Sequence, residues 1–119
     1  MKCSIIAFFL AFGISVHAEN NIDPVIKNIG ELVSATYFHD NGNIHQKGFF
    51  NKKGQLEGLW ISYDFDGNKL SQGYYSNGEK TGQWMFWNQS SLKEVYFIDS
   101  KIVNINEWEQ KSDIALNTK

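Results

Sequence analysis

The sequence predicts an all-β protein, an antiparallel meander of successive hairpins that forms one elongated repeat sheet. A tandem motif carries this prediction, because it repeats at a 24-residue period in which Gly54, Gly58, Trp60 and Tyr63 recur as Gly78, Gly82, Trp84 and Trp87. Short runs of aromatic and β-branched residues alternate with tight-turn pairs, which is typical of hairpins. Self-similarity at a fixed period indicates a repeat array whose units stack on one another.

The turn pairs divide the chain into its expected strands. Asn41-Gly42, Lys53-Gly54, Asp66-Gly67 and Asn77-Gly78 suit hairpin turns, since these residues tolerate positive φ. We expect strands at residues 34–39, 44–51, 58–64, 69–76, 82–87, 92–97 and 102–108. The copies outside 48–87 are degraded, as the end caps of repeat arrays are.

The two ends of the chain are predicted to lie outside the repeat domain of residues 34–108. Lys2 precedes an apolar run of about a dozen residues and the small-residue pattern Val16-His17-Ala18, the layout of a signal peptide cleaved after Ala18. An uncleaved membrane anchor is the competing interpretation, but a bilayer span needs about 20 apolar residues, more than this run contains. Residues 19–33 form a lead-in, either a short helix or a loose segment, and residues 109–119 a flexible tail. We therefore expect export to the periplasm or the medium.

Charge and composition exclude several classes of partner. Loss of Lys2 leaves 10 basic residues against 13 acidic ones, and no arginine occurs in the chain. Nucleic acid is therefore not expected, because arginine is the usual clamp for phosphate and guanine. Membrane association is the less favoured alternative for the same reason. Cys3 lies in the predicted signal peptide, so no disulfide is expected in the mature chain.

The segment from Gly73 to Trp87 resembles a MORN repeat, and especially its bacterial variant in the YwqK-type antitoxin component family. Its units read roughly Gly-x-Tyr/Phe-x-Asn-Gly-Lys-x-x-Gly-x-Trp-x-x-Tyr, and Trp87 stands at the final tyrosine. The copy from Gly48 departs more, with Lys53 at the turn asparagine. About 60 residues, 38–97, carry the resemblance. It implies a mostly single-layer sheet of hairpins that serves as a binding or assembly module.

The recurring aromatic residues are the candidate binding residues: Trp60, Tyr63, Trp84 and Trp87. Strand alternation places Trp60 and Trp84 on one face of the sheet and Tyr63 and Trp87 on the other. The structural interpretation is that each position stacks on its own copy in the next repeat. The functional interpretation is that an exposed aromatic face binds a peptide, a glycan or a second copy of the sheet.

Two polar motifs suggest a metal site at first sight, but neither has the spacing of one. The segment Asp64 to Asn68 hints at a calcium loop, but Lys69 and Tyr75 occupy the positions where an EF-hand needs glycine and glutamate. A two-residue turn at Asn41-Gly42 would place His39 and His45 on opposite sides of a hairpin, unless a bulge changes the register. We expect no metal, cofactor or small-molecule ligand.

The resulting functional hypothesis is an exported, non-catalytic scaffold that binds a protein or associates with itself, in the envelope or outside the cell. No nucleophile elbow, phosphate loop or His-Glu-x-x-His motif occurs, so an enzyme is not expected. Two alternatives stay open. A YwqK-type antitoxin would bind a toxin in the cytoplasm, which suits an exported chain poorly. A small nucleotide-handling enzyme, such as a nucleotidyltransferase, is the less favoured alternative.

Overall fold

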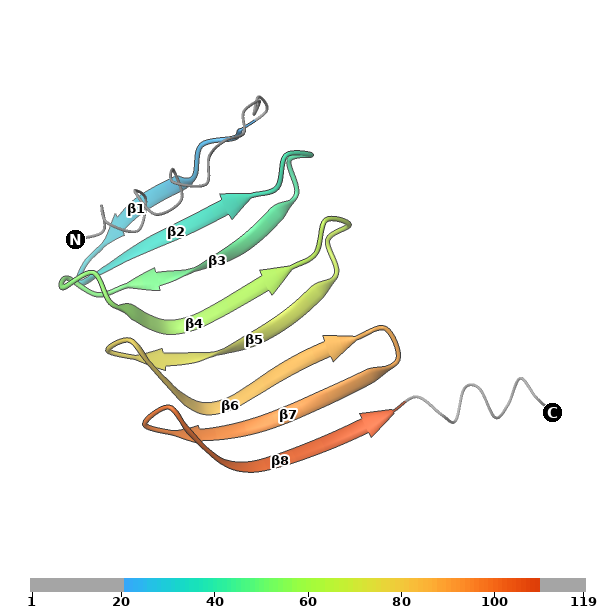
Figure 1. Cartoon of the computed structure of the whole chain (residues 1–119). Helices are drawn as coiled ribbons and strands as arrows, with labels where there is room; N and C mark the ends of the chain where they lie inside the picture. Colours follow the sequence, from blue (N-terminus) through green and yellow to red (C-terminus); the bar gives the residue numbers. More distant parts are fainter. Residues whose placement is uncertain (1–20, 110–119) are drawn as a thin grey trace, which may run out of the picture.

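A computed structural model describes residues 21–109 as one antiparallel sheet whose strands follow one another in chain order (Figure 1). Within this range the eight strands are β1 (Val25–Ile29), β2 (Leu32–Phe38), β3 (Ile44–Phe50), β4 (Leu56–Tyr63), β5 (Lys69–Ser76), β6 (Glu79–Asn88), β7 (Ser91–Ile98) and β8 (Lys101–Glu109). The predicted all-β hairpin meander is confirmed. The predicted signal peptide and residues 110–119 of the tail lie outside the described residues.

The lead-in predicted for residues 19–33 is corrected in one respect, because residues 25–29 form strand β1 and not a helix. Val25, Ile26 and Ile29 are β-branched, and β-branched side chains fit a pleated strand better than a helix. Gly30, at φ 64°, allows the tight turn that returns the chain along β2. The sheet therefore begins about nine residues earlier than the sequence predicted.

The repeated glycines and tryptophans build one structural unit, which occurs twice. The register shifts by two residues between Lys47 and Phe49 of β3 and again between Gln72 and Tyr74 of β5, so that β4 and β6 each carry extra residues there. Gly58 in β4 and Gly82 in β6 lie among these extra residues and adopt the positive φ that they require, at 74° and 71°.

In each unit the tryptophan ring lies directly over a glycine of the preceding strand. A Cβ atom added to Gly48 would overlap the indole of Trp60, and one added to Gly73 would overlap that of Trp84. Only glycine leaves room for this close approach, which explains why Gly48 and Gly73 recur with their tryptophans.

The core lies on the face of the sheet that carries these two tryptophans, called the tryptophan face below. Its buried hydrophobic side chains are Ala35, Trp60, Trp84, Val95 and Phe97. Their neighbours Tyr75 and Phe86 are partly buried against Trp84, Val95 and Phe97. The rings meet mostly edge to face, with centroids 5.1 Å apart for Tyr75 and Trp84 and 6.1 Å apart for Trp84 and Phe97.

The sheet is elongated, with extents of 53 × 37 × 26 Å and a Cα radius of gyration of 17.3 Å. A compact domain of 100 residues has a radius of gyration of about 13 Å. The turns lie along two rims on opposite sides of the sheet (Figure 1). We call them the Asn41 rim (turns at 39–43, 64–68 and 89–90) and the Asn77 rim (turns at 30–31, 51–55, 77–78 and 99–100).

Candidate functional site

The structure places the four candidate binding residues in two different environments. Trp60 and Trp84 are only 5% exposed and belong to the core of the tryptophan face. Tyr63 and Trp87 are partly exposed on the opposite face. The alternation expected from the sequence thus separates the pairs, and only Tyr63 and Trp87 are accessible to a partner in this sheet.

The polar atoms of the two buried indoles are satisfied within the sheet. The Trp60 Nε1–H donates to the Phe49 carbonyl at 2.9 Å, and the Trp84 Nε1–H donates to the Tyr74 carbonyl at 3.0 Å. In both units the acceptor is the residue that follows the glycine under the ring. The two tryptophans therefore hold neighbouring strands together at the register shift, a structural role that leaves no polar group for a ligand.

The Asn77 rim is joined from turn to turn by hydrogen bonds. The Gly78 N–H donates to the Leu56 carbonyl at 2.9 Å, and the Asn77 N–H donates to a Glu57 carboxylate oxygen at 2.8 Å. Further along, Ser100 exchanges two bonds with the Lys80 backbone. The turns at 77–78 and 99–100 are thus each fixed by hydrogen bonds to the hairpin before them.

The Asn41 rim is joined at its first gap and open at its second. The side chains of Asn41 and Asn43 both donate to the Phe65 carbonyl at 2.9 Å. Among residues 21–109, no hydrogen bond joins the turn at 64–68 to the turn between β6 and β7. That second turn is shorter, because Asn88 pairs with Ser91 and leaves only two residues between them.

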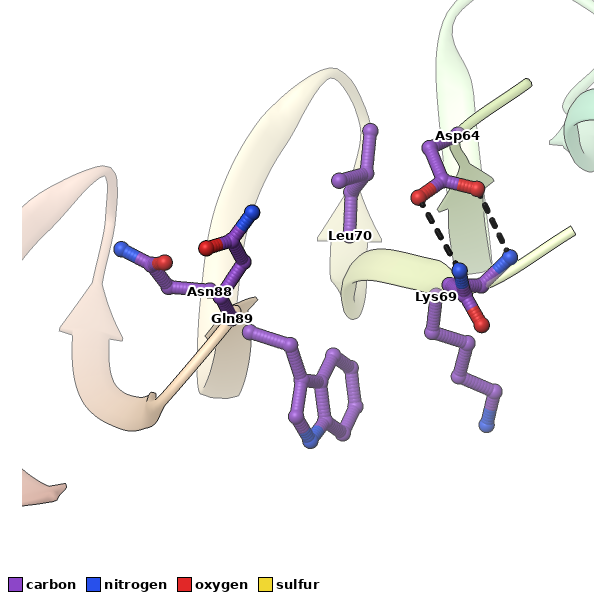
Figure 2. A pocket seen from close by; sticks show the side chains of 7 residues that line it. Asp64, Lys69, Leu70, Asn88 and Gln89 are labelled. Atoms are coloured by element: carbon purple, nitrogen blue, oxygen red, sulfur yellow. Dashed lines mark hydrogen bonds between the residues drawn. The ribbon is translucent and has the colours of Figure 1, made fainter. Parts of the chain in front are cut away.

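A hollow of about 840 Å³ occupies the second gap (Figure 2). Figure 2 shows Leu70 and Asp64 on one side of it and Asn88 and Gln89 on the other. The lining residues are Asp64, Asn68, Lys69, Leu70, Trp87, Asn88 and Gln89. Of the sequence-predicted aromatics, Trp87 alone lines this hollow.

The charged groups of the hollow are already engaged by their neighbours. Asp64 accepts bonds from the Asn68 and Asp66 N–H groups at 2.9 Å, and the Asn68 bond is the main cause that lowers the pKa of Asp64. Lys69 Nζ donates to Gln72 at 2.8 Å and lies 5.6 Å from the centre of the Trp87 ring. The hollow therefore offers mainly side-chain amides and a covered indole.

The expectation that His39 and His45 lie on opposite sides of their hairpin is wrong. Their ring centroids are 4.4 Å apart. A register shift between Tyr37 and Phe38 pairs Phe38 with Ile44 and lengthens the turn, which brings the two rings together. Burial, and then the charge of His39, lowers the pKa of His45. His39 Nε2 is bonded to the Tyr63 carbonyl at 3.0 Å.

A histidine pair alone is not a metal centre. Across the described part of the chain, no group of three or more histidine, cysteine, aspartate or glutamate side chains is placed to hold a metal ion. The same residues contain no helix that is long and apolar enough to cross a membrane.

Exposed apolar side chains gather on both edge strands, on β1 and on β8, and sequence reasoning placed no candidate residue on either. Those on β8 are Ile102 (56%), Val103 (55%), Ile105 (50%) and Trp108 (51%). Within residues 21–109, β8 has a neighbouring strand, β7, on one side only, which leaves these side chains exposed. Residues 102–108 were correctly predicted to be a strand. The available signal was that this strand comes last and lacks the glycine and turn pair of the repeat.

The core of the tryptophan face reaches the edge at β8 without a polar boundary. Trp84 pairs with Val95, and Val95 pairs with Ile105. Exposure rises from 5% and 4% at the first two residues to 50% at the third. We call the four exposed apolar residues of β8 the β8 edge. Exposed apolar residues grouped in this way are typical of protein-binding surfaces.

Comparison with known proteins gives no information about the function of this chain. No protein-family model matches the chain, and no curated protein shows significant similarity to it.

Proposed function

We propose that this chain is an exported, non-catalytic MORN-like repeat protein that acts as a binding or assembly scaffold, and that the β8 edge is its contact surface. The single observation that carries the proposal is that Ile102, Val103, Ile105 and Trp108 are exposed on β8, the strand at which the row of buried core residues ends with Ile105. A strand at the edge of a sheet that carries exposed apolar side chains is suited to adding a further strand.

The distribution of polar groups supports a scaffold rather than a site of chemistry. The indoles of Trp60 and Trp84 are bonded to backbone carbonyls, and the Asp64 carboxylate is bonded within its own turn. These groups stabilise the sheet. Reading an active site starts from convergent, available groups in a concave pocket. The open hollow beside Trp87 presents amides without a nucleophile and base in contact.

Export is the part of the proposal that rests on the sequence. Residues 1–18 have the order of a signal peptide, with Lys2, an apolar run and a small-residue cleavage pattern. The mature chain would lack cysteine, so its stability outside the cytoplasm depends on the packing and pairing described above.

Site-specific photo-cross-linking in intact Gram-negative cells tests the contact surface. A photoreactive phenylalanine replaces either Trp108 on the β8 edge or Phe65 on the Asn41 rim, two aromatic residues that are both 51% exposed. We expect protein adducts from position 108 and far fewer from position 65. Equal labelling, or none at 108, would contradict the proposed contact surface. A chain that stays full-length in the cytoplasm would contradict export.

A further inference from the structure

We propose that the β8 edge pairs antiparallel with the β8 edge of a second copy of this chain, with Ile105 at the two-fold axis. The sheet would then continue across both molecules. This inference rests on the proposed function, since it names the partner of the same surface.

The two edge strands of the sheet differ in how well they can accept a partner. β1 has five residues and directly follows Pro24, which lacks a backbone donor. β8 has nine residues and contains no proline. Short strands and proline are features by which natural sheets protect their edges. β8 also carries Lys101 and a bulge at Val103, but of the two edges it offers the longer, proline-free strand for pairing.

The charge pattern of β8 favours an antiparallel copy of itself. Lys101 stands at the start of the strand and Glu107 near its end. Antiparallel self-pairing brings the lysine end of each strand beside the glutamate end of the other. Parallel pairing in register would instead place Glu107 beside Glu107, and like charges directly opposite each other destabilise a strand pair.

The side-chain pattern sets the register. A bulge at Val103 interrupts the pairing of β8 with β7, so the regular stretch begins at Asn104. Pairing about Ile105 places Asn104, at the start of this stretch, opposite Asn106 of the other copy, and places the bulge residue Val103 opposite Glu107. The two isoleucines then face each other on the tryptophan face, because Ile105 is the partner of Val95.

In this arrangement the cross-strand row Trp84, Val95 and Ile105 continues into the second copy. Within one chain the row ends at Ile105, which is 50% exposed next to Val95 at 4%. In the pair it runs from Val95 through both isoleucines to Val95 of the second copy. β-branched residues directly opposite one another stabilise antiparallel strands. Burial of the isoleucines supplies the apolar driving force.

A charge-swap experiment tests the pairing directly. The full chain, as processed by its host, is examined by sedimentation equilibrium over a range of concentrations, together with the variants Ile105→Lys, Ile105→Glu and Ile98→Lys. Ile98 is the matched control, because it is an isoleucine 59% exposed at the end of β7, away from the outer side of β8. Circular dichroism checks that each variant keeps its sheet.

We expect the unmodified chain and Ile98→Lys to dimerise. Each Ile105 variant should dimerise at least about 100-fold more weakly, because two like charges meet at the axis. An equimolar mixture of Ile105→Lys and Ile105→Glu should restore a dimer, since opposite charges then face each other. Restoration is the result that a merely unfolded or misfolded variant cannot give.

Three results would overturn the inference. The first is a monomer at every concentration, and the second is a dimer that Ile105→Lys leaves intact. The third is open polymerisation that grows with concentration, which indicates pairing of β8 with β1 of the next copy. A monomer that still gives adducts with other proteins at position 108 in cells removes the self-pairing alone. A monomer without such adducts removes the proposed function as well.

Discussion

Trp84 and Trp108 are the same residue type on two strands of one sheet, yet Trp84 is 5% exposed and Trp108 is 51% exposed. Trp84 lies over Gly73 and has a strand on each side, whereas Trp108 stands on the last described strand and on the opposite face, since it pairs with Leu92, the partner of Trp87. In a sheet of one layer, the burial of a tryptophan therefore depends on its face, on the neighbouring strands and on a glycine under the ring. The tryptophan of the interior is buried by its own chain, and the tryptophan of the last described strand is exposed.

Replacing the two tryptophans should give the largest contrast in stability. We expect Trp84→Ala to lower the free energy of unfolding by about 3–5 kcal/mol, because it leaves a cavity between β5 and β7. Trp108→Ala, on the exposed edge, should cost less than about 1 kcal/mol in the monomer. Urea denaturation of both variants at a low protein concentration measures the difference. Similar losses would show that the two environments are equivalent.

The glycine under the ring gives the next largest effect. Gly73→Ala should cost about 1–3 kcal/mol, because the new methyl group overlaps the Trp84 indole. The cost should fall sharply in a Trp84→Leu background, whose smaller side chain leaves room. A double-mutant cycle measures this coupling. Additive effects would mean that the glycine is needed for some other reason than the ring.

A substitution at Gly82 isolates the effect of backbone conformation, because no neighbouring atom would contact the added side chain. No atom lies within 4 Å of a Cβ added there, but its φ is 71°. We expect Gly82→Ala to cost about 1–2 kcal/mol through backbone strain alone. The cost should be the same with tryptophan or leucine at position 84, in contrast to Gly73→Ala. A strong dependence on residue 84 would contradict the separation of the two glycine roles.

The smallest effect concerns the histidine pair near the N-terminal end of the sheet. The pKa of His45 is lowered in the folded state by burial and by His39. Its stabilising contribution is complete above the ordinary histidine pKa of about 6.5 and is lost as the pH falls through the lowered folded value. His45→Gln should therefore flatten the fall in melting temperature between pH 7.5 and pH 5. An unchanged slope would assign the acid sensitivity to other groups.

The central repeats were predictable from the sequence because each of their signals is local. The turn pairs, the alternation around Trp60 and Trp84 and the recurring glycines locate the middle strands to within a few residues. The sequence also separates Trp60 from Tyr63 by face. The reason for Gly48 and Gly73 was not predictable, because it depends on the ring of a residue on the next strand.

The edges were harder to predict because they depend on what is absent from one side of a strand. The apolar spacing near Ile26 and Ile29 left a helix open, and pairing with β2 decides for a strand. The contact between His39 and His45 follows from a bulge that no local pattern marks. The β8 edge was missed for a related reason, since its strand pattern is ordinary and only its final position exposes it.

Hydrogen–deuterium exchange at two protein concentrations tests the contrast between interior and edge most directly. If β8 pairs between copies, the backbone amides of Lys101–Glu109 that point away from β7 should be protected at high concentration and exchange faster on dilution. The amides of β4, β5 and β6 should exchange at the same rates in both samples. Exchange of the β8 amides that does not depend on concentration would contradict the account, and would mean that the C-terminal edge is complete within a single chain.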